Sequence, residues 1–178
     1  MQHIDYLNLK DINSPLQQDI LDAIHQVVES GWYLQGKANQ QFAEAYAQYI
    51  GTQYCIPCGN GLDALKLMLR GEMELGRLHE GDEIIVPEPA YANYMAFAVS
   101  AGAVIRPITA SIEDGFALPS VEKFEELIND RTRGILICNP NNPTGYLYTR
   151  REMNQIRDLV KKYDLYLFSD EVYREYIY

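Results

Sequence analysis

Polar residues follow two short apolar runs late in the chain, and their types and spacing could support chemistry. Residues 134–138 (GILIC) lead into 139–145 (NPNNPTG), and residues 165–168 (LYLF) lead into Ser169, Asp170 and Tyr173. Each proline bars the helical region to the residue before it, so the two Asn-Pro steps predict a stiff turn that holds Asn142 as a hydrogen-bond donor. A partly buried Asp170 would need a positive or hydrogen-bonding partner, and a cationic ring nitrogen would serve.

Two earlier segments could hold other parts of a ligand. Residues 58–65 (CGNGLDAL) carry two glycines ahead of a predicted helix, and free backbone N–H groups there could bind a phosphate. No Lys-Ser or Lys-Thr follows at the spacing of a Walker loop, and a plain turn that needs glycine for its dihedrals is the alternative. The two-proline turn 87–91 (PEPAY) presents Tyr91, which could stack on a flat ring or simply pack under the loop.

These candidates all fall at the ends of predicted strands. After Gly51, short apolar runs alternate with helical patterns, which indicates an α/β fold with a mainly parallel sheet. Ligands of such sheets bind beyond the carboxyl ends of the strands. Thr149 and Glu152 form a capping box at the start of the last helix. The predicted strands are about Gln53–Pro57, Glu83–Pro87, Val104–Ile108, Gly134–Cys138 and Leu165–Ser169, and the helices between them are about Leu62–Leu75, Tyr91–Ala101, Ser120–Asn129 and Thr149–Tyr163.

Two helices are predicted ahead of the sheet. The first begins with Ser14 as N-cap and Pro15 at the first helical position, and it stops at Gly31. The second spans about Ala38–Tyr49 and ends at Gly51. We therefore expect an N-terminal helical arm followed by one sheet-forming unit.

Composition excludes several classes of function. The chain has 178 residues, with 15 Lys and Arg against 25 Asp and Glu, and a net charge of −10 argues against nucleic acid as a partner. No stretch approaches the roughly 18 consecutive apolar residues of a membrane span, and the first residues lack the pattern of an export signal. Three cysteines are too few for a secreted disulfide framework. We expect a cytoplasmic protein without a metal site.

Taken together, the NPNNPTG segment with Asn142, the SDEVY segment with Asp170 and Tyr173, and Tyr91 after the proline turn resemble the class I and II aminotransferases of the aspartate aminotransferase fold. The likeness runs from about residue 81 to residue 178. It implies a three-layer α/β/α large domain over residues 52–178, with residues 1–51 as the helical arm. It also implies small-molecule substrates (an amino acid with a 2-oxo acid or keto-sugar) and a homo-oligomer.

The resemblance further implies pyridoxal 5′-phosphate as cofactor. Asp170 would pair with the pyridinium nitrogen and keep the ring an electron sink. Asn142 and Tyr173 would hydrogen-bond the phenolic oxygen of the ring, and Tyr91 would stack on its face. The backbone at Gly61 and Leu62 would hold the phosphate.

The first eighty residues are similar to another family with the same fold and cofactor. Residues 30–36 (SGWYLQG) and 59–65 (GNGLDAL) resemble the DegT-type sugar aminotransferases, which often have Thr where this chain has Leu62. We therefore expect a mosaic with a seam near residues 80–83.

One departure from both families bears on activity. Aminotransferases of this fold need a lysine that forms a Schiff base with the cofactor, some tens of residues after the Asp-x-x-Tyr motif. None of the chain's lysines occupies the matching position; they are Lys10, Lys37, Lys66, Lys123, Lys161 and Lys162. In the family's sheet, two strands that this chain lacks lie between the first strand and the others. The predicted strand Gln53–Pro57 would therefore have no neighbours. We expect the chain by itself to be inactive and to assemble with other chains.

Two other hypotheses stay open. Cys55 and Cys58 form a C-x-x-C ahead of a helix, as in redox proteins, although two structural cysteines explain the pattern as well. A non-catalytic fragment that serves as an interaction module would suit the missing lysine and the acidic charge.

Overall fold

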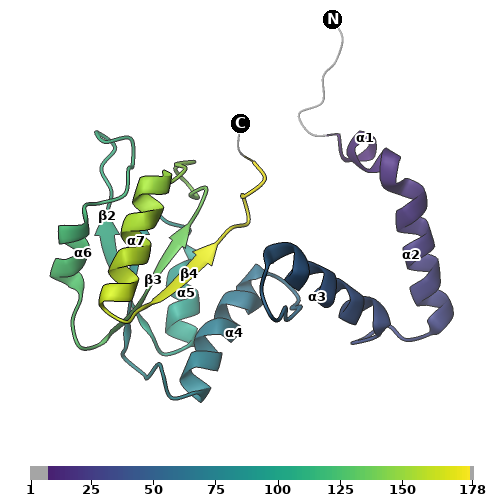
Figure 1. The fold of residues 1–178 in the computed structure, drawn as a ribbon, viewed down its shortest axis with the longest axis horizontal. Coiled ribbons are helices and arrows are strands. Elements are labelled where there is room, and N and C mark those ends of the chain that lie inside the picture. Colours follow the sequence, from purple (N-terminus) through teal and green to yellow (C-terminus); the bar gives the residue numbers. More distant parts are fainter. Residues whose placement is uncertain (1–7, 177–178) are drawn as a thin grey trace, which may run out of the picture. The chain divides into compact units, whose positions relative to one another are not determined.

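The computed structural model describes residues 8–176. The chain divides into two compact units, Met1–Cys58 and Gly59–Tyr178. The first is helical, and the second contains the sheet (Figure 1).

The sheet of the second unit consists of four parallel strands in the order β2-β1-β3-β4. They are β1 (Glu83–Glu88), β2 (Val104–Thr109), β3 (Thr132–Cys138) and β4 (Tyr166–Asp170). The parallel sheet and four of the five predicted strands are confirmed, with bounds that shift by one or two residues. Since all the strands are parallel, their carboxyl ends meet at one edge of the sheet.

Helices cover both faces of this sheet (Figure 1). On one face, α4 (Gly61–Glu74) and α5 (Asn93–Ser100) pack through Leu69 and Phe97. On the other face, α6 (Val121–Leu127) and α7 (Arg150–Lys162) pack through Phe124 and Ile156. The predicted three-layer α/β/α architecture is therefore confirmed, and the capping box of Thr149 and Glu152 at α7 is present.

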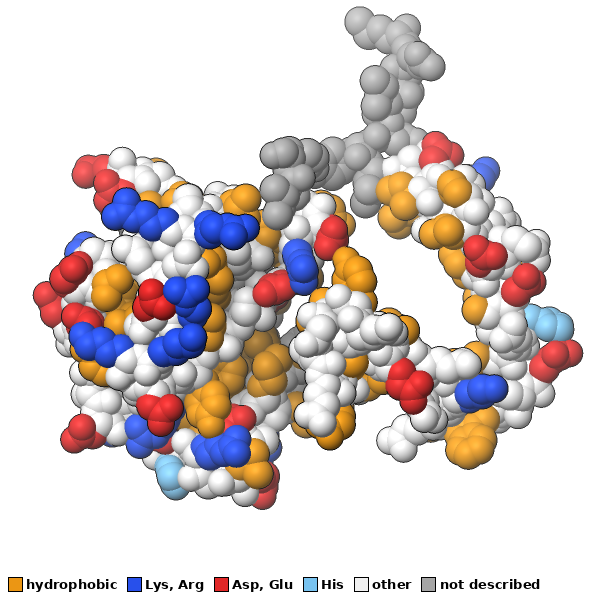
Figure 2. Space-filling model, in the orientation of Figure 1, with side chains coloured by type: hydrophobic (Ala, Val, Ile, Leu, Met, Phe, Trp, Pro, Cys, Tyr) orange, Lys and Arg blue, Asp and Glu red, His pale blue; other side chains and the backbone are white. Residues whose placement is uncertain are grey.

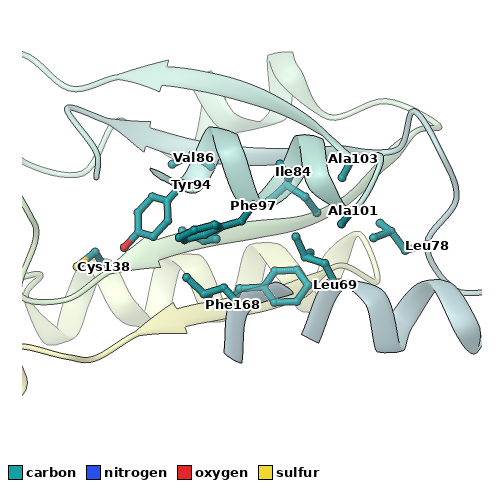
Figure 3. Packing of buried hydrophobic residues seen from close by; sticks show 13 residues of the cluster. Leu69, Leu78, Ile84, Val86, Tyr94, Phe97, Ala101, Ala103, Cys138 and Phe168 are labelled. Carbon is teal, nitrogen blue, oxygen red and sulfur yellow. The ribbon is translucent and has the colours of Figure 1, made fainter. Parts of the chain in front are cut away.

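The central strands are buried on both sides because their side chains alternate between two cores. Ile84 and Val86 of β1 point into the core beneath α4 and α5, which Figure 3 shows, whereas Ile85 packs beneath α6 and α7. In β3, Cys138 joins the first core and Ile137 the second. These continuous apolar runs are what the sequence pattern predicted.

The fifth predicted strand, Gln53–Pro57, is wrong. The residues between α3 and α4 are irregular and pair with no strand of the described chain. A strand exists only through hydrogen bonds to a neighbour, so an apolar pattern without an adjacent strand does not form one.

The helical unit begins earlier than predicted. It contains α1 (Leu9–Asn13), a 3₁₀ turn η1 (Ser14–Leu16), α2 (Gln17–Ser30) and α3 (Lys37–Ile50). The hydroxyl of Ser14 donates to the carbonyl of Asp11 at 3.0 Å and does not cap a helix, so the predicted N-cap is wrong. The predicted stops at Gly31 and Gly51 are confirmed, since both residues end their helices in the left-handed conformation.

This helical unit has almost no core of its own. Ala47 is its only buried hydrophobic residue within the described range, while Ile24, Trp32 and Phe42 are more than half exposed. Figure 2 shows such hydrophobic side chains open at the surface of the unit. No helix between residues 8 and 176 is long and apolar enough to cross a membrane.

Candidate functional site

A cavity of about 290 Å³ opens in the sheet-containing unit at the carboxyl ends of the strands. All six site residues predicted from the sequence line it: Gly61, Leu62, Tyr91, Asn142, Asp170 and Tyr173. Its volume is close to the lower limit of roughly 300 Å³ for small-molecule pockets. The structure thus brings together residues that the sequence separates by up to 112 positions (from 61 to 173).

The sheet topology explains why they meet. Strand order reverses between β1 and β3, because the chain leaves β1 toward β2 on one side and returns to β3 on the other. Such a switch point leaves a crevice beyond the strand ends. Tyr91 follows β1, Asn142 follows β3 and Asp170 ends β4, so the three residues reach the same crevice from three strands.

Helix α4 contributes its amino terminus to the cavity through Gly61 and Leu62. Asn60 caps the helix by accepting a hydrogen bond from the backbone N–H of Asp63 at 2.9 Å. Gly61 has no positive φ, and a Cβ placed on it would meet no atom within 4 Å. Neither dihedral angles nor packing therefore require glycine here, which weakens the plain-turn alternative. The bare backbone leaves room for a group to approach the first N–H groups of the helix.

Asp170 is the acidic group of the cavity. Its Oδ2 accepts a hydrogen bond from the hydroxyl of Tyr94 at 2.8 Å, and its Oδ1 accepts one from the backbone N–H of Val172 at 3.1 Å. Burial, together with hydrogen bonds to Cys138 and Asp170, raises the pKa of Tyr94 far above its ordinary value. The phenol of Tyr94 therefore stays protonated and acts as a donor to the carboxylate.

Asn142 and Tyr173 approach each other from separate loops. The Asn142 Nδ2 lies 3.4 Å from the Tyr173 hydroxyl, to which it donates. The turn that carries Asn142 is held by Asn141, whose Oδ1 accepts from the backbone N–H and the hydroxyl of Thr144 at 3.2 and 2.9 Å. An amide and a phenol at this spacing could both donate to one oxygen atom of a ligand.

Tyr91 lies just before α5 and not within it, so the predicted start of that helix was two residues too early. Its hydroxyl accepts a hydrogen bond from Asn93 Nδ2 at 2.6 Å, and its ring meets Tyr94 edge to face at 5.6 Å between centroids. These contacts fix the orientation of the Tyr91 ring at the cavity wall.

Tyr94 and Cys138 also line the cavity, although the sequence did not predict them as site residues. Tyr94 stands in helical register with Phe97 and Ala98, a pattern typical of core residues. Cys138 ends an apolar strand, and burial raises the pKa of its thiol, which donates to the carbonyl of Pro140 at 3.2 Å. The cysteines of the C-x-x-C segment, Cys55 and Cys58, lie in the irregular segment before α4.

Comparison with known proteins identifies the family. The model of the family "Aminotransferase class I and II" matches residues 11–178. The chain belongs to this family. One relative is a dTDP-3-amino-3,6-dideoxy-alpha-D-galactopyranose transaminase from Aneurinibacillus thermoaerophilus. The two sequences are 34% identical over 168 residues, which is 94% of this chain and 43% of the relative. This chain is 32% identical over 167 residues to the glutamate-pyruvate aminotransferase AlaA of Escherichia coli K12, covering 93% and 38%.

Solved aminotransferase structures share the fold. Aspartate aminotransferase from Thermus thermophilus with maleate superposes with a TM-score of 0.59 at 32% identity, covering 65% of this chain and 28% of that chain. Alanine aminotransferase from Pyrococcus furiosus gives a TM-score of 0.66 over 88% of this chain and 41% of that chain, and at 24% identity this likeness concerns the fold alone. The aminotransferase-family chain thus spans less than half of the length of these relatives.

Both resemblances extend over most of the chain. The class I and II family model includes residues before position 80, and the sugar-nucleotide relative matches 94% of the chain. The predicted likeness to aminotransferases of both kinds is therefore confirmed, and both matches extend across residues 80–83.

Proposed function

We propose that this chain supplies the cofactor-binding wall of a pyridoxal-phosphate-dependent aminotransferase. The convergence of Gly61, Tyr91, Asn142, Asp170 and Tyr173 around one cavity carries the proposal. Their chemistry suits a flat, phosphorylated and cationic aromatic ring, because each part of such a ring has a matching group in the wall.

Each residue takes one part of the cofactor in this proposal. Backbone N–H groups at Gly61 and Leu62 bind the phosphate, and Tyr91 stacks on the ring face. The carboxylate of Asp170 pairs with the ring nitrogen and holds its proton. When bound, the cofactor supplies an electron sink for the carbanion formed at the substrate carbon.

Asn142 and Tyr173 act on the other side of the ring. Their donors, 3.4 Å apart, orient on the phenolic oxygen of the cofactor. Hydrogen bonds from Asn142 and Tyr173 to that oxygen would favour its ionised form. The open position beside Gly61 supports the fit, since an approaching phosphate meets no side chain there.

We base the proposed activity of the whole protein on the names of its relatives. We infer transfer of an amino group between an amino acid and a 2-oxo acid or keto-sugar, since the relatives' names include a glutamate-pyruvate aminotransferase and a sugar-nucleotide transaminase. Residues 52–178 form part of the cofactor-binding domain and residues 1–51 an arm of a homo-oligomer. The location is cytoplasmic, and neither nucleic acid nor a membrane is a partner.

A lysine for covalent attachment of the cofactor is the component that this wall does not provide. Within residues 8–176, no lysine lines the cavity. The 178-residue chain therefore binds the cofactor without a covalent bond and does not transfer amino groups by itself. The competing proposal, a non-catalytic interaction module, predicts no cofactor binding.

Cofactor binding by the purified chain tests the proposal. Equilibrium dialysis measures affinity for pyridoxal 5′-phosphate in the wild type, in Asp170→Asn, and in Asp158→Asn, an exposed aspartate of α7 that serves as control. We expect saturable binding that Asp170→Asn weakens about tenfold, as for loss of a charged hydrogen bond, and that Asp158→Asn leaves unchanged. After borohydride treatment, peptide mapping should find no lysine with stoichiometric label. Absence of saturable binding in the folded wild type would refute the proposal, and turnover of glutamate with a 2-oxo acid would refute the inactivity.

A further inference from the structure

Asp170 is held at both of its carboxylate oxygens. Oδ1 accepts from the backbone N–H of Val172 at 3.1 Å, within its own loop, and Oδ2 accepts from the Tyr94 hydroxyl at 2.8 Å, from a residue 76 positions away. The first contact anchors the carboxylate locally. The second joins the end of β4 to α5 across the cavity wall and determines the rotation of the carboxylate plane.

Tyr94 is itself fixed by its surroundings. Its side chain is 3% exposed and packs edge to face against Tyr91 and Phe97, with ring centroids 5.6 and 6.2 Å away. Figure 3 shows its hydroxyl directed toward Cys138, at the end of β3. A rigid ring gives its hydroxyl one position, so the donor is already in place before any ligand enters.

The carboxylate keeps lone pairs for a ligand despite these two bonds. Each oxygen of an ionised carboxylate has two acceptor sites, and Asp170 and Tyr94 both line the cavity. The bond from Tyr94 occupies one site on Oδ2 and leaves other acceptor sites of the carboxylate available to a guest. The Tyr94 hydroxyl thus determines the position of the Asp170 oxygen that accepts a hydrogen bond from a cation or N–H group of the ligand.

We propose that Tyr94 is a positioning residue that orients Asp170 toward the ring nitrogen of the cofactor. The inference rests on the proposed function and deepens it. Tyr94 acts through Asp170 and does not contact the nitrogen. Its contribution should therefore appear only when both the carboxylate and a ring nitrogen are present.

A pair of probes isolates this contribution. One is pyridoxal 5′-phosphate, and the other is its analogue with carbon in place of the ring nitrogen. The change that a substitution makes in the ratio of the two dissociation constants reports the Asp170 contact, because the other contacts of each probe are the same in all variants. We expect the wild-type chain to favour the natural cofactor by about tenfold or more, as for a charge-assisted hydrogen bond.

Tyr94→Phe removes the hydroxyl and keeps the ring. We expect this variant to lower the ratio at least about threefold, and Asp170→Asn to bring it close to one. The double variant should match Asp170→Asn, since Tyr94 has no target left. Tyr146→Phe is the matched control, because this hydroxyl also donates to a carboxylate, Glu152, at 3.0 Å, but does not line the cavity. It should leave the ratio unchanged.

The outcomes separate the two proposals. A wild-type ratio near one refutes the role of Asp170 and with it that of Tyr94. A wild-type ratio of tenfold that Tyr94→Phe leaves intact overturns the positioning role alone and makes Tyr94 a packing residue. If Tyr94→Phe does not fold, 4-fluorophenylalanine at position 94 fills the space of the hydroxyl without donating a proton, and the same comparison applies.

Discussion

Gly61 offers a way to separate folding from ligand binding at a single atom. Outside the neighbouring backbone, a Cβ at this position meets no atom within 4 Å, and Gly61 lines the cavity where we assign the phosphate. We expect Gly61→Ala to leave the free energy of unfolding unchanged or slightly higher, because alanine restricts the unfolded chain more than glycine does. Affinity for pyridoxal 5′-phosphate should fall about tenfold or more, equal to about 1.4 kcal/mol.

The matched control for Gly61→Ala is Gly71→Ala, in the same helix. A Cβ at Gly71 is also free of contacts, but the residue lies outside the cavity. This substitution should raise stability by about 0.5–1 kcal/mol, the helical preference of alanine over glycine, with no effect on binding. Chemical unfolding measures the effect on stability, and equilibrium dialysis measures the effect on affinity. If both variants bound the cofactor equally well, the proposal that Gly61 binds the phosphate would be wrong.

The site residues differ in how far the sequence could predict them. Asn142, Asp170 and Tyr173 follow apolar strands in polar segments, a local pattern that predicted them as site residues, and all three line the cavity. The sequence did not predict Tyr94, because its helical spacing is that of a core residue and its hydrogen-bond partner, Asp170, lies 76 positions away. A contact between a helix and a strand of that separation depends on topology, which local spacing does not encode.

At the scale of elements, the contact between β3 and β4 depends on a glycine. A Cβ on Gly134 would lie 2.8 Å from the Phe168 ring and 3.0 Å from the Tyr166 carbonyl oxygen. We expect Gly134→Ala to lower the free energy of unfolding by about 1–3 kcal/mol, because the buried ring and the paired strand must both shift. Urea unfolding measures the loss. A Gly134→Ala chain as stable as the wild type would show that the two strands separate more easily than their packing indicates.

Helix α7 should respond to acid through its capping box. Burial tends to raise the pKa of Glu152, but hydrogen bonds from Thr149, Leu118 and Tyr146 together lower it below its ordinary value. A lowered pKa stabilises the folded state above the ordinary value of 4.5, and this stabilisation disappears as the pH falls through the lowered pKa. Glu152→Gln should therefore cost about 1 kcal/mol at neutral pH and progressively less as the pH falls from 4.5 through the lowered pKa.

Urea unfolding of the wild type and Glu152→Gln across this pH range measures the effect. Glu126→Gln, at an exposed position of α6, is the control and should change the free energy of unfolding by less than about 0.5 kcal/mol. A Glu152→Gln deficit that stays constant with pH would assign the loss to packing and not to the carboxylate charge.

Local signals account for what the sequence predicted of these elements. The capping box, the helix stops at Gly31 and Gly51, and the apolar runs of the strands depend on neighbouring residues, and they are confirmed. The strand at Gln53–Pro57 failed, because strand formation requires a partner that the pattern of one segment cannot supply.

At the scale of the whole molecule, the helical unit exposes a hydrophobic stripe. Ile20, Ile24 and Val28 recur at four-residue spacing along α2, with exposed fractions of 42, 54 and 56%. Such a stripe is buried when another surface covers it, and the proposed homo-oligomer would do so. We expect the chain to associate in a concentration-dependent manner and Ile24→Lys to lower the average mass.

His25→Lys tests whether added charge alone has this effect. His25 lies on the polar side of α2, near Glu29, and its side chain is 71% exposed. This variant should associate like the wild type. Sedimentation equilibrium measures the mass of all three proteins, and a wild-type chain that is monomeric at every concentration would contradict the proposed assembly.

Among residues 8–176, strand β4 pairs with β3 alone, and this asymmetry extends to Asp170 at its end. Amide groups along a strand point alternately to its two sides, so within residues 166–170 some amides are tied to β3 while their neighbours face outward. Deuterium uptake should therefore alternate from residue to residue. If another polypeptide pairs with the outer side of β4, the fast-exchanging amides should become slow. Asp170, at the end of this strand, would then be held more rigidly at the cavity.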